Sequence, residues 1–179
     1  MTLKQNLPHL DAINSYQFVT FRTKDSIDSF VLNLQSQNMP NNTKQASIDS
    51  YLDNSPKGAY LNNHILDSLY RYLVNLDNRI YELIAFSIMP NHVHILFKQT
   101  QPIAKTMQQI KGGSAKLIND ILNRKDSLWC SDYFDRAIRD EKHFETTYNY
   151  IKNNALKARL QDHHKRFYSI YYSQMEKGL

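Results

Sequence analysis

Two histidines separated by one residue, His92 and His94, are the sharpest chemical feature of the sequence. If this segment is a strand, alternate side chains point to the same face, so the two imidazoles project together while Val93 faces the core. Imidazoles that converge in this way can bind one divalent metal ion. Two half-exposed histidines beside a turn would give the same pattern, so the pair alone leaves both interpretations open.

A second group with possible chemistry lies on a helix that the sequence predicts from Asp140, a good capping residue, to about Ala158. Helical steps of three and four residues separate an apolar stripe (Phe144, Tyr148, Ile151, Ala155, Ala158) from a polar one (His143, Thr147, Tyr150, Asn154, Lys157). Tyr148 and Tyr150 differ by about 200° around the axis, so Tyr148 is predicted to pack in the core. Tyr150 shares the polar face with Asn154 one turn later, which places a nucleophile beside a potential ligand. An ordinary surface tyrosine is the alternative.

The elements that must position these groups can be predicted from apolar periodicity. Strands are expected at 15–23, 81–89, 93–98 and within 127–138, and helices at 60–76, 102–123 and 140–158. The polar segment of about 25–58 is expected to form a helical turn followed by a long surface loop. Gly112 and Gly113, inside a predicted helix, indicate a kink or a close backbone approach. This order predicts an α+β, ferredoxin-like sandwich: an antiparallel sheet with helices packed on one face.

Composition limits the class of protein. The chain has 179 residues, 41% of them hydrophobic, which suits one globular domain spanning 1–179. One cysteine excludes a disulfide framework or a cysteine-rich zinc site, and no apolar run approaches a membrane span, so we expect a cytoplasmic protein without a membrane partner. The net charge of +5 arises entirely after residue 100, where 14 basic residues face 9 acidic ones, and this favours a polyanionic partner. The basic and aromatic tail 161–179 is expected either to contact nucleic acid or to pack its aromatics on the core.

The segment from Met89 to Leu96, MPNHVHIL, resembles the HUH signature of the IS200/IS605-type single-tyrosine transposases, closest to the REP-associated tyrosine transposases. Three further segments agree in order and spacing. They are similar to the family's lysine-containing helix (107–119), its aromatic and Ile-Arg-Asp block (129–140) and its Tyr-Ile-x-x-Asn segment (150–158).

The resemblance implies a function and a set of site residues. Tyr150 falls on the family's nucleophile, and His92, His94 and Asn154 fall on its metal ligands, for which Mg²⁺ or Mn²⁺ is expected. The implied reaction is cleavage and rejoining of single-stranded DNA at hairpin-bearing ends through a 5′-phosphotyrosine intermediate. The implied location is cytoplasmic, nucleoid-associated when bound to DNA, and a homodimer is possible. Candidate contacts to the DNA backbone are Lys111, Lys116, Arg136, Arg139, Lys152 and Lys157.

The sequence departs from the family pattern at Ala155, where proline is usual after the ligand asparagine, and its 25–58 segment is longer than the family norm. Three alternatives are open. A replication-initiator or relaxase nickase shares the histidine pair but normally belongs to a larger chain. A domesticated or inactive protein of the same fold would bind hairpin DNA without cleaving it. A small zinc hydrolase would need an acidic base near the histidines, and no motif places Glu82 or Asp120 there.

Overall fold

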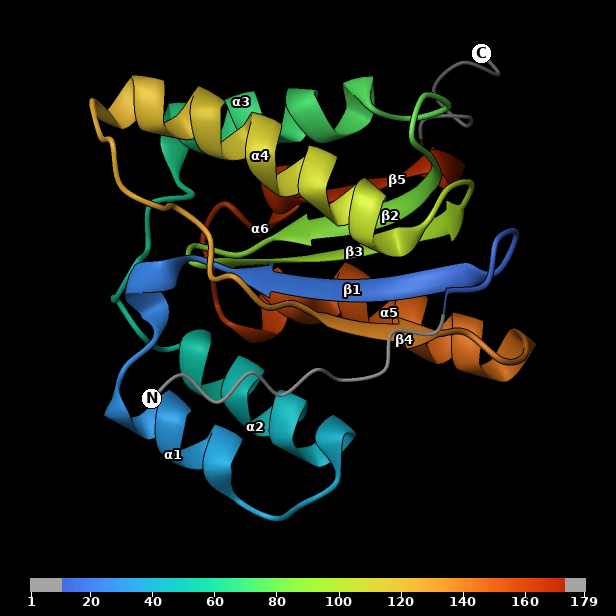
Figure 1. Ribbon diagram of the computed structural model, residues 1–179, viewed down its shortest axis with the longest axis horizontal. Coiled ribbons are helices and arrows are strands. Elements are labelled where there is room, and N and C mark those ends of the chain that lie inside the picture. Colours follow the sequence, from blue (N-terminus) through green and yellow to red (C-terminus); the bar gives the residue numbers. More distant parts are fainter. Residues whose placement is uncertain (1–10, 173–179) are drawn as a thin grey trace.

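The computed structural model of the protein describes residues 11–172 (Figure 1). At its centre lies a five-stranded antiparallel sheet with strand order β4-β1-β3-β2-β5. The strands are β1 (Tyr16–Arg22), β2 (Tyr81–Ile88), β3 (His92–Gln99), β4 (Phe134–Ala137) and β5 (Phe167–Ser169). The first four strands and the helices between them follow the βαββαβ order of ferredoxin-like proteins. The predicted α+β class with an antiparallel sheet is therefore confirmed.

Six α-helices and one short 3₁₀ helix surround the sheet in the described range. They are η1 (Lys24–Ser26), α1 (Ser29–Ser36), α2 (Asn41–Leu52), α3 (Asn63–Asn75), α4 (Ile103–Leu122), α5 (Glu141–Lys157) and α6 (His163–Arg166). Asp140 caps α5 as predicted, because its Oδ1 accepts a hydrogen bond of 2.7 Å from the backbone N–H of His143. Within residues 11–172, no helix has the length and apolar content needed to cross a membrane.

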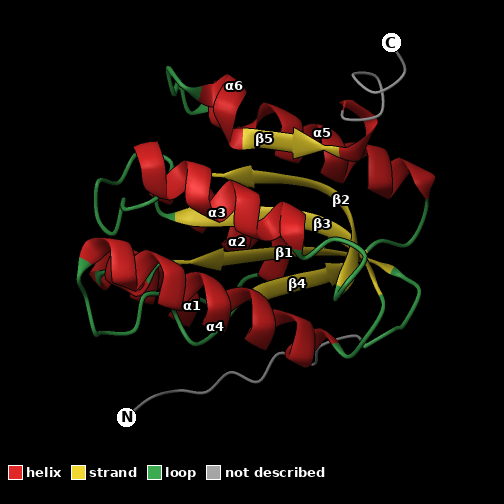
Figure 2. Ribbon diagram, turned by 90° about the horizontal axis from the view of Figure 1, so that it is seen from above, coloured by secondary structure: helices red, strands yellow, loops and turns green. Residues whose placement is uncertain are grey.

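Helices cover both faces of the sheet, whereas the sequence predicts helices on one face only (Figure 2). The larger core lies between the sheet and helices α3 and α4, and it includes Val19 and Phe21 from β1. A smaller core lies on the opposite face, where Phe18 and Leu96 pack against Ile151 of α5. Nearly all residues of β1 and β3 are buried. Because successive residues of a strand face opposite sides, both faces of these strands are buried and both require cover.

The segment 25–58 differs from its prediction as a turn and a surface loop, because most of it folds into helices α1 and α2. The two helices pack on each other around their own small core of Val31, Leu34, Ile48 and Leu52. The buried side of α2 also includes Gln45 and Asp49. A helix whose buried face is half polar shows little apolar periodicity, so the pattern on which the prediction relied is weak here.

The tail prediction concerns residues 161–179, of which 173–179 lie outside the described residues. In the described part of this tail, α6 and β5 pack against β2 and α5, and the Tyr168 ring stacks on Phe86 at a centroid distance of 5.2 Å. This part of the tail thus extends the sheet beside β2 and places aromatic side chains on the core.

Gly112 and Gly113 of α4 allow a matched pair of stability predictions. A Cβ on Gly113 would collide with the hydroxyl of Tyr72, whereas a Cβ on Gly112 meets no atom within 4 Å. We therefore expect Gly113→Ala to lower the free energy of unfolding by about 1–2 kcal/mol through overpacking. Gly112→Ala should raise it by about 0.5–1 kcal/mol, because alanine favours the helix. Equilibrium urea unfolding of both variants measures the two changes. Equal changes in the free energy of unfolding would contradict the close approach of Tyr72 to Gly113.

Candidate active site

Four side chains on the sheet form the base of the site, on the face that α5 covers. In the register of β1 with β3, Thr20 lies opposite His94 and Arg22 opposite His92. Directly opposed residues of an antiparallel pair point to the same face, so these four side chains form a block. All four are buried, and the two histidines are 0% exposed.

Second partners orient both imidazoles. The side-chain nitrogen of Asn91 donates to the carbonyls of Leu52, Ser55 and Lys57, which turns its oxygen toward His92. That oxygen lies 2.8 Å from His92 Nδ1, so Nδ1 carries the proton and the Nε2 lone pair points into the site. His94 Nδ1 is hydrogen-bonded to the Thr20 hydroxyl at 2.7 Å. The two Nε2 atoms face each other at 3.1 Å.

Burial keeps both histidines uncharged at neutral pH. Desolvation lowers the pKa of His92 well below its usual value, and repulsion from a second proton on His94 and from the charge of Arg22 lowers it further. Desolvation also lowers the pKa of His94 to about 3. A neutral imidazole with a free lone pair is the form that binds metal ions, so the pair is chemically ready to act as ligands.

Helix α5 brings Tyr150 and Asn154 to this block, one turn apart. The Tyr150 hydroxyl lies 3.5 Å from His94 Nε2. Burial, the charge of Asp49 and the hydrogen bond to Asp49 raise the pKa of Tyr150 well above its usual value, and the Asn154 amide partly opposes them. Asn154 is 3% exposed, and its Oδ1 has no hydrogen-bond partner among the described residues. The structure thus assembles Tyr150, Asn154 and both histidines in one cluster, as the spacing and the resemblance led us to expect.

Helix α2 adds an acidic pair that the sequence analysis missed. Asp49 is 4% exposed and accepts hydrogen bonds from the Tyr150 hydroxyl (2.9 Å) and from Gln45 Nε2 (2.6 Å). One turn later, Asp53 places its Oδ1 3.7 Å from His92 Nε2. Burial raises the pKa of Asp49 to about 7 and that of Asp53 to about 6. Thus α2 with its C-cap residue Asp53 presents two polar side chains, four residues apart, to the same block, as α5 does.

The geometry fits a divalent cation. Asp49, His92 and His94 each offer one ligand atom, and these atoms all lie within 4.8 Å of one another. Two buried oxygens of the same cluster, Asn154 Oδ1 and Asp53 Oδ1, accept no hydrogen bond from the described part of the chain. Buried acceptors without donors are costly, and a cation within reach of these oxygens would offset that cost.

The raised pKa of Asp49 predicts how the metal-free protein responds to pH. The unfolded carboxyl ionises near pH 4 and the folded one near 7, so the folded state binds more protons in between and loses stability as pH rises. Asparagine does not titrate, so Asp49→Asn should be more stable than wild type at pH 8 by about 2 kcal/mol or more, and similar to it near pH 4. Urea unfolding in EDTA at both pH values measures this, with exposed Asp67→Asn as the control. Equal stabilities of Asp49→Asn and wild type at pH 8 would contradict the proposed cost of burying the ionised Asp49 carboxylate.

The six basic residues predicted to contact DNA divide between the two faces. Lys111 and Lys116 lie on α4, across the sheet from the histidines, and the Lys111 ammonium donates to the Ser131 carbonyl at 2.7 Å. The other four lie on or next to the elements that carry the site: Arg136 on β4, Arg139 just after it, and Lys152 and Lys157 on α5. The latter group is therefore the better placed to contact a strand that enters the cluster.

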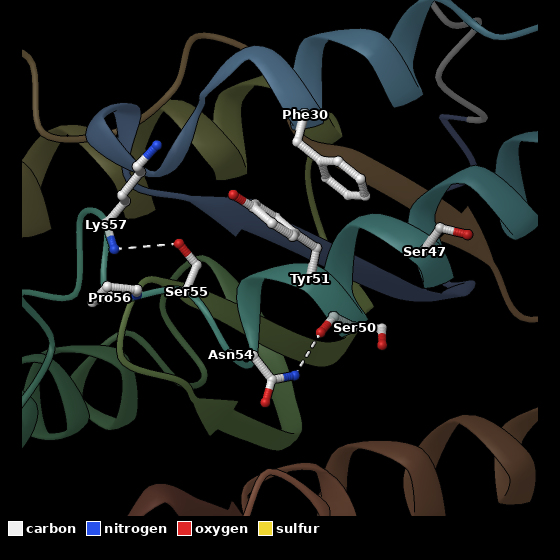
Figure 3. A pocket seen from close by; sticks show the side chains of 8 residues that line it. All are labelled: Phe30, Ser47, Ser50, Tyr51, Asn54, Ser55, Pro56 and Lys57. Atoms are coloured by element: carbon white, nitrogen blue, oxygen red, sulfur yellow. Dashed lines mark hydrogen bonds between the residues drawn. The ribbon is translucent and has the colours of Figure 1, made fainter.

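An open pocket next to helix α2 belongs to a different surface from the histidine pair. It has a volume of about 450 Å³ and lies between α1 and α2, where Phe30 and Tyr51 face each other and Lys57 stands at one end (Figure 3). The two rings are 4.3 Å apart between centroids. None of the residues that line it belongs to the histidine, tyrosine and aspartate cluster, so this pocket is separate from the candidate active site.

Two signals could have indicated the missed residues. Thr20 and Arg22 repeat on β1 the alternate spacing of His92 and His94 on β3. Asp49 on α2 and Asp53 at the C-cap of that helix repeat the four-residue spacing of the tyrosine and asparagine on α5. Neither signal locates a residue in space without the strand register. The acid that a zinc hydrolase would need is thus present, so spacing in the sequence alone did not separate that alternative from a transposase.

Comparison with known proteins identifies the family. The model of the family described as transposase IS200-like matches residues 56–154. A solved REP-associated tyrosine transposase bound to a REP hairpin is 15% identical with a TM-score of 0.47, over 84% of this chain and 72% of that chain. A candidate transposase from Deinococcus radiodurans R1 is 17% identical with a TM-score of 0.48, over 83% and 96%. No curated protein shows a significant sequence match. Because the family match spans more than half of the chain and includes His92, His94 and Tyr150, this protein belongs to the IS200-like transposase family, as its resemblance implied.

Proposed function

We propose that the protein cleaves and rejoins single-stranded DNA at hairpin-bearing ends through a 5′-phosphotyrosine intermediate. The observation that carries this proposal is the position of the Tyr150 hydroxyl, 3.5 Å from His94 Nε2 and hydrogen-bonded to Asp49 in a buried polar cluster. Membership of the IS200-like family supports DNA as the substrate. A tyrosine so placed can act as a nucleophile toward a phosphodiester that reaches the histidine pair.

His92, His94, Asn154 and Asp49 would hold a divalent cation, which when bound would polarise a phosphate oxygen and neutralise negative charge. Imidazole nitrogens favour zinc, whereas carboxylate and amide oxygens favour Mg²⁺ or Mn²⁺. The unexpected carboxylate of Asp49 therefore supports the expectation of Mg²⁺ or Mn²⁺. It also gives the set a negative charge that two histidines and an asparagine lack.

Residues of the chain prepare Tyr150 for attack. A phenol is a poor nucleophile at neutral pH, and burial raises the pKa of Tyr150 further, so its proton must leave as the bond to phosphorus forms. Asp49 Oδ2 accepts the hydrogen bond of this hydroxyl and is the group that can receive the proton. The tyrosyl oxygen bonds to phosphorus, the bond from phosphorus to the 3′ oxygen breaks, and that oxygen takes up a proton as a free 3′-OH.

The covalent intermediate accounts for strand transfer without an external energy source. The phosphotyrosine bond retains the energy of the broken phosphodiester, so attack by a 3′-OH of another strand reverses the chemistry and releases Tyr150. Arg136, Arg139, Lys152 and Lys157 are proposed to hold the DNA backbone near the cluster, and Lys111 and Lys116 to contact it more remotely. Such contacts neutralise phosphates and weaken with salt, without reading the base sequence.

The test uses single-stranded hairpin oligonucleotides from the flanks of the gene, labelled at either end and incubated with Mg²⁺ or Mn²⁺. We expect a protein–DNA adduct on a denaturing gel that retains the 3′ label, disappears in EDTA, and accompanies release of the 5′-labelled fragment. Retention of the 5′ label instead would contradict the proposed polarity. Tight hairpin binding without an adduct under any metal would favour the non-catalytic hairpin-binding protein of the same fold.

A further inference from the structure

Arg22 is a buried charged residue that the proposed reaction has not yet used. It is the last residue of β1, lies opposite His92 in the register, and shares the face of the sheet that carries the histidine pair. Arg22 is only 7% exposed, and its Nη1 atom has no hydrogen-bond partner among the residues that the structure describes.

An arginine in this state is costly for the free protein. A buried charge is normally paired and hydrogen-bonded, because the interior does not replace the water that it loses. The positive charge of Arg22 lowers the pKa of Asp49, so the two lie in one electrostatic environment. No ion pair joins Arg22 to a carboxylate in the described range, however. The chain therefore holds a buried donor beside its catalytic cluster without giving it an internal partner.

The buried polar atoms of the cluster that have no hydrogen-bond partner indicate what kind of group Arg22 lacks. Asn154 Oδ1 and Asp53 Oδ1 are acceptors without donors, and Arg22 Nη1 is a donor without an acceptor. A cation satisfies the two acceptors but repels the guanidinium. The guanidinium is charged, so an anion is its most favourable acceptor, and a phosphate oxygen is the anion that the proposed substrate brings to this place.

We propose that Arg22 is a catalytic residue that binds a non-bridging oxygen of the scissile phosphodiester. The inference rests on the proposed function and adds to it a specific contact to the substrate. Guanidinium is planar, keeps its charge at all relevant pH values and matches the oxygens of a phosphate. Placed against a non-bridging oxygen, it stabilises the negative charge that accumulates there while the tyrosyl oxygen attacks. Position 22 lies outside the matched segment 56–154, so the family match does not assign it this role.

The test measures binding rather than cleavage. It uses the full chain carrying Tyr150→Phe, in EDTA, with two hairpin oligonucleotides that differ only at the mapped scissile position. One has the natural phosphodiester and the other a neutral methylphosphonate. With Arg22 present we expect the natural oligonucleotide to bind about tenfold more tightly or better, as for a hydrogen bond between charged groups. With Arg22→Gln added, the ratio of the two dissociation constants should fall to about one, and with Arg22→Lys to an intermediate value.

Controls separate this contact from general electrostatics and from folding. Arg79→Gln removes the same charge from an exposed position, so it should leave the ratio unchanged. Thermal unfolding of Arg22→Gln should occur at or above the temperature of the parent, because an unpaired buried charge has been removed. A ratio that Arg22→Gln does not alter, or a large drop in melting temperature, would overturn the assignment of Arg22 while the transposase chemistry stands. Failure of both oligonucleotides to bind the parent protein, in Mg²⁺ as well as in EDTA, would overturn the proposed function itself.

Discussion

Replacing Tyr150 by phenylalanine should abolish the covalent protein–DNA product completely. The substitution removes one oxygen atom, the only atom of this side chain that can attack phosphorus, and leaves the ring in its contacts with Phe18 and His94. If Tyr150 is the nucleophile, as proposed, its loss reduces the rate by several powers of ten, so no adduct should be visible on a denaturing gel. Hairpin binding should persist, because the ring does not supply the positive charges that hold the DNA backbone.

Tyr148 provides the matched control for this prediction. It lies on the same helix and is also half-buried, but its hydroxyl is hydrogen-bonded to Ser169 Oγ at 2.8 Å, away from the histidine pair. Tyr148→Phe also removes one phenolic hydroxyl, and adduct formation should stay within a few-fold of wild type. An adduct that survives Tyr150→Phe and disappears in Tyr148→Phe would assign the nucleophile to the wrong face of α5, and the mechanism would have to be abandoned.

The parts of the site that could be predicted from the sequence are those set by local periodicity. The two-residue repeat of a strand puts His92 and His94 on one face, and the 3.6-residue repeat of a helix puts Tyr150 one turn from Asn154. Neither statement needs knowledge of what packs where. The apolar stripe through Tyr148 was likewise correct as a packing surface, since this ring packs against the smaller core.

The parts that could not be predicted depend on long-range register and on polar burial. Arg22 becomes part of the site only because β1 pairs with β3 in a register that sets it opposite His92. Asp49 reaches the cluster from a helix whose buried face includes glutamine and aspartate, which an apolar pattern does not reveal. In both cases the residue type disfavours burial, and yet the side chain is buried in the site. Such conflicts between local preference and final position are typical of functional sites.

Arg166→Ala should cause the largest loss of stability of any substitution considered, about 3–5 kcal/mol, as is usual when one member of a buried charged network is removed. Arg166 is 2% exposed and donates five hydrogen bonds. Two go to Asp162, one to the Asn62 side chain, and two to the carbonyls of Leu61 and Ile88. Alanine would leave those buried carbonyls without a donor, which adds the cost of their desolvation. Equilibrium urea unfolding measures the difference.

The same network connects the tail to the candidate active site, which gives the prediction a second consequence. Ile88 ends the strand that leads into the turn before His92, so Arg166 supports the backbone that positions the histidine pair. We therefore expect Arg166→Ala to reduce adduct formation even at temperatures where the variant is folded. The exposed neighbour Lys165 on the same short helix is the control, because Lys165→Ala should change stability by less than about 0.5 kcal/mol. A loss below about 1 kcal/mol for Arg166→Ala would mean that water replaces the guanidinium at these carbonyls. The tail would then be an appendage of the sheet with no part in holding the site.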